Sequence, residues 1–210
     1  MVEVDVRIKV KVLRWLESLA VRPILLYRRL RYGYGFRRIR MAQPRYAKVD
    51  PADYKRLRKY EWVAEKKGTN SFYARRRAPG GKGKKWKLIS LHQEIIKAPP
   101  GMVIDHINHD GMDNRRANLR AATHSQNLYN RKKRSGATQS KYKGIYWRKK
   151  TGRWEVRIMF EKKAIHLGRF RSEIDAARAY DRGAMKYHGE FACLNFPQSA
   201  LRTGRRGLRR

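Results

Sequence analysis

Four residues in the middle of the chain combine a carboxylate, an imidazole and two amides at spacings that suit metal chemistry. Asp105 and His106 are adjacent, and Asn118 and Asn127 complete the set within 23 residues. Carboxylate and amide oxygens are hard ligands that suit Mg²⁺, or another divalent cation such as Mn²⁺, better than zinc. An unperturbed imidazole is mostly uncharged at neutral pH, so His106 could take a proton from water. We expect Asp105 and Asn127 to share one metal ion beside this base.

The flanking sequence predicts the elements that would position these residues. Residues 102–104 are typical of a short buried strand, which would end at Asp105 and His106, and a polar loop follows. The T-x-x-Q pattern that begins at Thr123 is a capping box, which predicts a helix with Asn127 in its first turn. Neighbours on a strand point to opposite faces, so Asp105 and His106 can serve one phosphate only if the strand ends or twists there.

Composition alone leaves a second interpretation open, because an Asp-His pair in a polar loop is more often a turn than a catalytic pair. His109 and His124 are interpreted as structural or solvent-facing residues. Arg115, Arg116 and Arg120 are interpreted as clamps on a phosphate backbone, although one of them near the scissile phosphate could stabilise developing charge.

The overall charge indicates a polyanionic partner. In 210 residues, 53 Lys plus Arg stand against 17 Asp plus Glu, for a formal net charge of +36. No window approaches the roughly 18 to 20 apolar residues of a transmembrane span, and the first residues lack the apolar block of a signal peptide. The single cysteine, Cys193, excludes an internal disulfide framework and zinc sites that need several thiolates. We therefore expect an intracellular, cytoplasmic protein that binds nucleic acid and no membrane.

The basic residues gather in segments with few or no acids. Residues 114–154 contain 13 Lys or Arg and no acid, and residues 22–40 contain seven Arg and no acid. The second segment is consistent with a solvated basic arm, a DNA-tracking arm, or an artefactual upstream start of translation. Residues 2–12 alternate between apolar and charged side chains, which predicts a strand and a possible pairing edge for a homodimer.

The last part of the chain predicts a three-stranded antiparallel sheet packed on one helix. Residues 144–148, 153–160 and 163–170 have strand patterns, and Ser172 is the expected N-cap of a helix whose buried stripe includes Ala177 and Tyr180. Alternation places Glu155 on the outer face together with a basic and aromatic set that could bind DNA in the major groove. That set consists of Tyr146, Arg148, Arg153, Arg157 and His166.

The segment IDHINHDGMDNRRANLRAATHSQNLYN resembles the HNH endonuclease motif of phage and intron-encoded homing nucleases, within residues 36–134. The resemblance implies a ββα-metal finger, in which two strands and one helix surround a divalent cation. Position by position, it implies the following roles: Asp105 as the metal carboxylate, His106 as the general base, Asn118 as the loop-bracing asparagine, Asn127 as the second metal ligand in place of a terminal His, and His92 as the first motif histidine.

The segments YKGIYWRKKTGRWEVRI, IHLGRFRSEIDAARAYDRGAMKYHG and FACLNFP resemble the DNA-binding domain of plant ethylene-response factors, the APETALA-two type. The resemblance covers residues 141–197 and implies binding of duplex DNA through the three-stranded sheet. It adds Lys143 to the outward positions that would contact DNA, for a total of six. His166 stands where plant members have Trp, and Arg157 where they have Glu. The resemblance therefore implies the binding mode and not the target sequence.

Together these patterns predict an α+β protein with five parts: a basic extension (1–35), a nuclease domain (36–134), a linker (135–140), a DNA-binding domain (141–197) and a basic tail (198–210). The combination resembles bacterial and phage homing endonucleases that hydrolyse double-stranded DNA with Mg²⁺. One alternative is a DNA-binding regulator with a degenerate nuclease domain. Another is a ribosome-associated basic protein, which would explain the charge but not the ordered Asp-His, Asn, Asn series.

Overall fold

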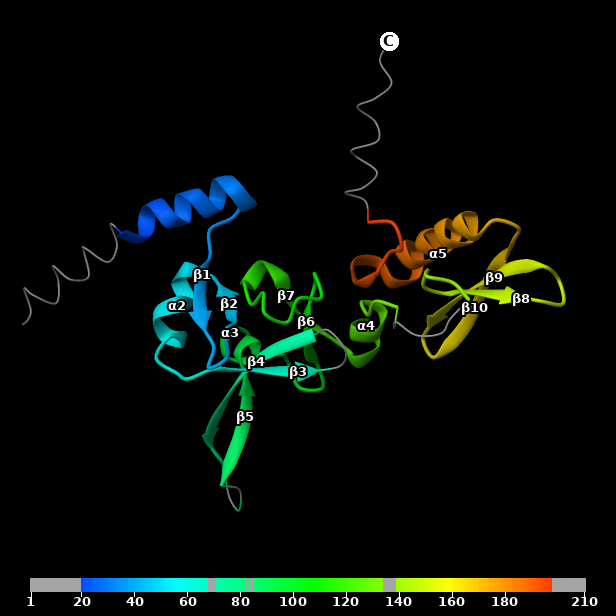
Figure 1. Cartoon of the computed structure of the whole chain (residues 1–210). Helices are drawn as coiled ribbons and strands as arrows, with labels where there is room; N and C mark the ends of the chain where they lie inside the picture. Colours follow the sequence, from blue (N-terminus) through cyan, green and yellow to red (C-terminus); the bar gives the residue numbers. More distant parts are fainter. Residues whose placement is uncertain (1–19, 68–70, 82, 84, 134–138, 198–210) are drawn as a thin grey trace, which may run out of the picture. The chain divides into compact units, whose positions relative to one another are not determined.

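The computed structural model describes residues 20–67, 71–81, 83, 85–133 and 139–197 (Figure 1). The strand expected at residues 2–12, residues 135–138 of the expected linker and the whole expected basic tail (198–210) lie outside these residues. The described residues form two compact units. The first unit contains the residues up to Lys97 together with Asp110–Arg120, and the second contains Ala98–His109 together with the residues from Ala121 onward.

The first unit contains two antiparallel sheets and short helices. β1 pairs with β2, and β4 lies between β3 and β5. A compact core of buried apolar side chains, including Phe36, Leu57 and Trp62, holds these elements together. The elements are β1 (Arg37–Arg40), β2 (Tyr46–Val49), α2 (Pro51–Leu57), β3 (Val63–Lys67), β4 (Ser71–Pro79), β5 (Trp86–Ser90) and α3 (Leu91–Ile95).

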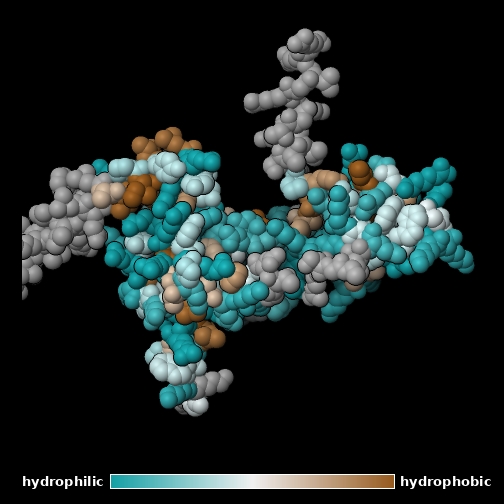
Figure 2. Space-filling model, viewed as in Figure 1, coloured by the Kyte–Doolittle hydropathy of each residue, from teal (hydrophilic) through white to brown (hydrophobic). Residues whose placement is uncertain are grey.

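Part of the Arg-rich segment is helical, although the sequence indicated only a basic arm. Residues 20–32 form a helix, because Leu and Arg favour helices. The helix ends at Gly33, whose φ of 78° suits the left-handed conformation that closes many helices. Ile24, Leu26 and Leu30 are exposed on this helix, and Figure 2 shows hydrophobic atoms gathered there against a largely hydrophilic surface.

The loop Asp110–Arg120 packs closely on β4 of the first unit. A β-carbon at Gly111 would clash with the carbonyl oxygen of Phe72 and the ring of Tyr73. Asp113 and Lys48 form an isolated parallel bridge to β2. The loop is therefore held by its backbone, and only glycine fits at position 111.

The second unit begins with a strand and a short helix that carry the predicted chemistry. β6 and β7 form a two-stranded sheet, and α4 follows β7 directly. Its remaining elements are the three-stranded sheet and the helix that the sequence predicts for residues 141–197. The bounds are β6 (Val103–His106), β7 (Leu119–Ala122, whose first two residues belong to the first unit), α4 (His124–Tyr129), β8 (Ile145–Arg148), β9 (Arg153–Phe160), β10 (Lys163–Phe170), α5 (Glu173–His188) and η2 (Gly189–Phe191). The short helix η1 (Arg116–Asn118) lies in the first unit.

The three-stranded antiparallel sheet, in the order β10-β9-β8, packs on α5 as predicted. Val156 and Ile158 from β9 contact the helix residues Ala177 and Tyr180 in one buried core, and the Ser172 side chain accepts from the backbone of Asp175 to cap α5. These contacts confirm the α+β prediction for this part of the chain.

Gly144 is required by the packing of α5 on the sheet. It has a φ of 77°, and a β-carbon there would clash with the ring of Tyr180. The Gly in the Y-K-G-I-Y-W segment therefore allows the helix to approach the start of β8.

No helix in the described part of the chain has both the length and the apolar character needed to cross a membrane.

Candidate functional site

Asp105 and His106 form the end of β6, and both are buried, each with 5% of its surface exposed. The side-chain amide of Asn130 holds this end of the strand. Its Nδ2 atom donates to both carboxylate oxygens of Asp105 at 3.0 and 2.9 Å, and it lies 3.1 Å from the carbonyl oxygen of His106. Asn130 thus fixes the orientation of the Asp105 carboxylate with a neutral donor, a contact that orients the charge without cancelling it.

The capping box that the sequence predicts is present and begins α4. The Thr123 hydroxyl accepts from the backbone of Gln126 at 3.2 Å, and the Gln126 side chain accepts from the backbone of Thr123 at 2.8 Å. Asn127 lies in the helix, half-buried, and Asn130 is its C-cap. Because α4 also packs against β6, the cap positions Asn127 and Asn130 on the element that contacts the strand carrying Asp105.

Asn130 is the neighbour of Asp105 that the sequence analysis missed. It follows Asn127 by three residues, a spacing that places two side chains on the same side of a helix. That spacing was a usable signal, but it requires knowledge that α4 packs against β6.

Asn118 occupies a loop-bracing position. It is buried, and its Nδ2 atom donates to the backbone oxygen of Asp113 at 2.7 Å. Asn114 likewise donates to the backbone oxygen of Gly111 at 3.1 Å. These two amides close the Asp110–Arg120 loop on itself within the first unit.

Two of the three predicted phosphate clamps form ion pairs inside the first unit. Arg115 binds the Asp113 carboxylate through two hydrogen bonds of 2.8 and 2.7 Å, and Arg116 binds Asp53 through two of 2.8 and 3.0 Å. Burial would raise the pKa of Asp113, but the hydrogen bonds and charge of Arg115 outweigh it and hold the pKa below its usual range. Both guanidinium groups therefore stabilise the fold, and Arg120 lies half-buried in β7.

The remaining motif histidines have different surroundings. His92 lies in α3 of the first unit and packs edge-on against Tyr73, with ring centroids 6.2 Å apart. His109 has a left-handed backbone with a φ of 65°, and its Nε2 atom hydrogen-bonds to the backbone oxygen of Asn130. Burial lowers the pKa of His109, which favours its neutral form. His124 is exposed at the start of α4.

The side chains predicted as metal ligands are of the hard-oxygen type. Among the residues that the structure describes, no group of three or more His, Cys, Asp or Glu side chains could hold a metal. The predicted ligands are instead one carboxylate, from Asp105, and one amide oxygen, from Asn127. Such a sparse oxygen set suits Mg²⁺, which keeps several waters and shares its shell with phosphate.

The outer face of the β8–β10 sheet is basic but contains a buried acid. Glu155 is only 3% exposed, because Arg148, Arg157 and His166 cover it. Arg157 lies 2.8 Å from the Glu155 carboxylate, and His166 lies 3.6 Å from it. Hydrogen bonds from Arg148 and then Arg157 lower the pKa of Glu155. The outward direction of Glu155 was predicted from alternation, but its burial under three basic side chains was not.

Five of the six predicted DNA-binding residues are exposed, and these are Tyr146, Arg148, Arg153, Arg157 and His166. Lys143 differs from the outward position that the sequence predicts. Its ammonium donates to the backbone oxygens of Tyr129 and Arg131, at 2.7 Å each, and burial lowers its pKa. Lys143 therefore binds the end of α4. It lies two residues before β8 begins, so the alternation of the strand does not set the direction of its side chain.

Tyr129 at the end of α4 stacks on His188 at the end of α5. The two rings are nearly parallel, with centroids 3.8 Å apart and 4° between their planes. His188 also hydrogen-bonds to the backbone oxygen of Met159 at 2.8 Å, and the backbone of Glu161 donates to the Tyr129 hydroxyl at 3.3 Å. With the Lys143 contacts, these interactions attach the helix that carries Asn127 to the sheet module.

Comparison with known proteins separates the two resemblances along the chain. Residues 97–129 match a family model described as HNH endonuclease. The chain is 48% identical over 59 residues to APETALA2-like protein 2 of Oryza sativa subsp. indica, covering 27% of this chain and 13% of that protein. It is 46% identical over 57 residues to the AP2-like ethylene-responsive transcription factor TOE2 of Arabidopsis thaliana, covering 27% of this chain and 12% of that protein.

A third relative has a larger share of its length in common with the chain. It is the dehydration-responsive element-binding protein 1E of Oryza sativa subsp. indica, 44% identical over 79 residues, which are 34% of this chain and 36% of that protein. The chain thus spans well under two thirds of each of these relatives. It combines an HNH endonuclease motif with an AP2/ERF-type DNA-binding domain, and the sheet packed on α5 is consistent with that domain.

Proposed function

We propose that the protein is a metal-dependent DNA endonuclease of the homing type, which binds duplex DNA through its AP2/ERF-type domain. The observation that carries the proposal is the end of β6, where the buried Asp105 carboxylate is oriented by Asn130 and His106 is adjacent. Asp105 and His106 lie within residues 97–129, which match the HNH endonuclease model, and Asn130 directly follows that segment. We assign the nuclease to residues 36–134, with a ββα-metal finger as its centre, and the DNA-binding domain to residues 141–197.

In this proposal Asp105 and Asn127 would hold one Mg²⁺ ion, and Asn130 keeps the Asp105 carboxylate in one orientation. Bound metal would stabilise the charge that develops on the phosphate and on the leaving 3′ oxygen. His106 accepts a proton from water, whose oxygen attacks the phosphorus atom, and the bond from phosphorus to the 3′ oxygen breaks. Asn118 braces its own loop through its contact with Asp113.

The sheet contributes DNA binding through its exposed outer face. Tyr146, Arg148, Arg153, Arg157 and His166 present donors and aromatic surface, and Arg suits bidentate contact with guanine or phosphate. If the protein neutralises about six to ten phosphates, its affinity should fall about 10³ to 10⁵ fold between 50 and 200 mM salt.

Plasmid cleavage tests the proposal. With Mg²⁺ or Mn²⁺ the protein should nick or cut supercoiled DNA, and Asp105→Ala and His106→Ala should each abolish cleavage. Both variants should still retard duplex DNA in a metal-free gel, while the exposed-histidine control His124→Ala should cleave normally. Unchanged cleavage in both site variants would overturn the proposed mechanism.

A second candidate is a DNA-binding regulator that does not cleave. Its support is the AP2/ERF similarity, since one matched relative is named a transcription factor. In that case the protein would bind one duplex sequence selectively and leave it intact with every divalent cation. The same plasmid assay, with binding measured in parallel, separates the two functions.

A further inference from the structure

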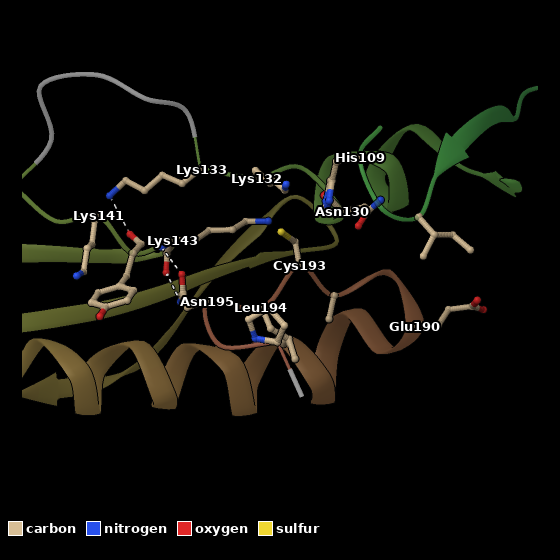
Figure 3. Close-up of a pocket in the computed structure, with 14 residues that line it drawn as sticks. His109, Asn130, Lys132, Lys133, Lys141, Lys143, Glu190, Cys193, Leu194 and Asn195 are labelled. Carbon is tan, nitrogen blue, oxygen red and sulfur yellow. Dashed lines mark hydrogen bonds between the residues drawn. The ribbon is translucent and has the colours of Figure 1, made fainter. Parts of the chain in front are cut away.

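The second unit contains an open cavity of about 770 Å³ on the side of the sheet module that meets α4. Residues from the loop after β6, from the end of α4 and the segment that follows it, from the segment before β8 and from the segment after α5 line it (Figure 3). It lies outside the outer sheet face that we assign to DNA binding. The polar side chains that matter here are those of His109, Asn130, Lys132, Lys133, Lys141, Lys143, Glu190 and Cys193.

The cavity has a strongly positive lining. Four lysines line it, and Glu190 is the one acidic residue among the lining residues. Burial lowers the pKa of His109, and burial raises the pKa of the Cys193 thiol against the opposing effect of nearby lysines, so both groups favour their uncharged forms at neutral pH. Four like charges around one cavity repel each other, and a bound anion would relieve that repulsion.

The lysines divide into two kinds. Lys133 donates to the backbone oxygens of Ser140 and Tyr142, at 2.5 and 2.8 Å, as Lys143 does to the end of α4. These two ammonium groups connect the segments that form the cavity wall, and their positive charge lies next to the cavity. Lys132 and Lys141 are exposed, so their ammonium groups can bind a ligand directly.

The arrangement favours a linear anion over a compact one. Figure 3 shows the lysines spread in a row across the cavity, with His109 and Asn130 at one end, and not converging on a single point. Asn130 is also the residue that holds Asp105. The row of charge therefore leads to the residue that orients the proposed metal carboxylate.

We propose that this cavity binds the phosphodiester backbone of the duplex, in the stretch that joins the scissile phosphate to the sequence read by the sheet. The inference rests on the proposed function and assigns to Lys132 and Lys141 a role in setting the position of the cut. A free phosphate or pyrophosphate offers the same chemistry, so the test must separate the two sources.

Cys193 provides a direct probe, because it is the single cysteine of the chain and lines the cavity. We would measure its alkylation by N-ethylmaleimide, an uncharged reagent, in the full-length protein without metal so that no cleavage occurs. A duplex at about ten times its Kd should slow the reaction about tenfold, because only the free fraction reacts. Inorganic phosphate and pyrophosphate at matched ionic strength should leave the rate unchanged.

Charge variants provide the second measurement. The double variant Lys132→Gln, Lys141→Gln should lower the slope of log affinity against log salt by about 2, since each lost phosphate contact removes about 0.9. Lys186→Gln is the matched control, because Lys186 is exposed on α5 and does not line the cavity. Its slope should match that of the unmodified protein.

The outcomes separate this inference from the proposed function. Duplex binding without protection of Cys193 and with an unchanged salt slope in the double variant would overturn the cavity assignment and leave the endonuclease proposal standing. Protection by pyrophosphate equal to that by duplex would also overturn it, in favour of a small-anion site. Failure to bind any duplex would overturn both.

Discussion

Asp105 at the end of β6 and Glu155 in the sheet are buried to nearly the same degree, yet the side chains that hydrogen-bond to their carboxylates include different kinds of donor. Glu155 lies beneath two guanidinium groups and an imidazole, whereas Asp105 receives the neutral amide of Asn130 on both oxygens. Arginine partners neutralise a carboxylate and fix their own positions at the same time. A neutral amide orients a carboxylate and adds no positive charge beside it.

The difference assigns separate tasks to two acids in a chain of net charge +36. Glu155 holds basic side chains that face outward, so its role is to fix the positions of Arg148 and Arg157. In the proposed function, the Asp105 carboxylate itself binds the metal ion. The predictions below replace or perturb these two arrangements, beginning with the largest expected effect.

The first prediction exchanges each acid for its amide. Asp105→Asn should lower the rate of plasmid cleavage at saturating DNA by about a thousandfold, because metal stabilisation of the transition state amounts to several kcal/mol. Glu155→Gln should keep its cleavage rate at saturating DNA. If Glu155→Gln lost cleavage as fully as Asp105→Asn, the contrast between the two acids would be wrong.

The second prediction removes the amide that orients Asp105. Asn130→Ala should raise the Mg²⁺ concentration for half-maximal cleavage by about 10 to 100 fold, the range for groups that hold a metal ligand. The matched control is Asn114→Ala, another buried asparagine, whose side chain binds the Gly111 backbone. A purely structural role for Asn130 predicts that both variants lose folded protein while the Mg²⁺ dependence stays the same.

The third prediction concerns stability and pH. The pKa of Glu155 is lowered from its usual value of 4.5, so its pairing stabilises the fold fully above that value and is lost as pH falls through the folded pKa. Glu155→Gln should cost about 1 kcal/mol of unfolding free energy at neutral pH. Urea unfolding at successively lower pH should show this difference shrinking, and a difference that grows in acid would contradict the assignment.

The fourth prediction compares two arginines on the same strand, β9. Arg153 and Arg157 are both exposed, but Arg157 shares its charge with Glu155. Arg153→Gln should therefore lower the salt slope of duplex binding by about 0.9, and Arg157→Gln by less. Equal reductions would show that Glu155 does not compensate Arg157 in the complex.

Local patterns predicted the elements of the second unit well. The T-x-x-Q box at Thr123 and the cap at Ser172 place helix starts by hydrogen bonds between near neighbours in sequence, which short motifs encode. Alternation likewise predicted the inward side chains of β9, such as Val156 and Ile158.

Features that depend on distant contacts could not be predicted in the same way. The direction of Lys143 depends on the end of α4, and the burial of Glu155 depends on side chains from three strands. The role of Asn130 requires α4 to pack on β6. Pattern and spacing in the sequence indicate whether a residue lies in a helix or a strand and on which face of it. The contacts named here arise instead from the packing of one element on another.

The stack of Tyr129 on His188 has a consequence for domain exchange. A graft that moved residues 141–197 onto another nuclease would separate His188 and Lys143 from the helix end that they bind. The grafted module would keep its fold, but its position relative to the new nuclease domain would no longer be fixed by these contacts. We therefore expect that a transferable cassette begins at Thr123, before α4, and not at the sequence boundary near residue 141.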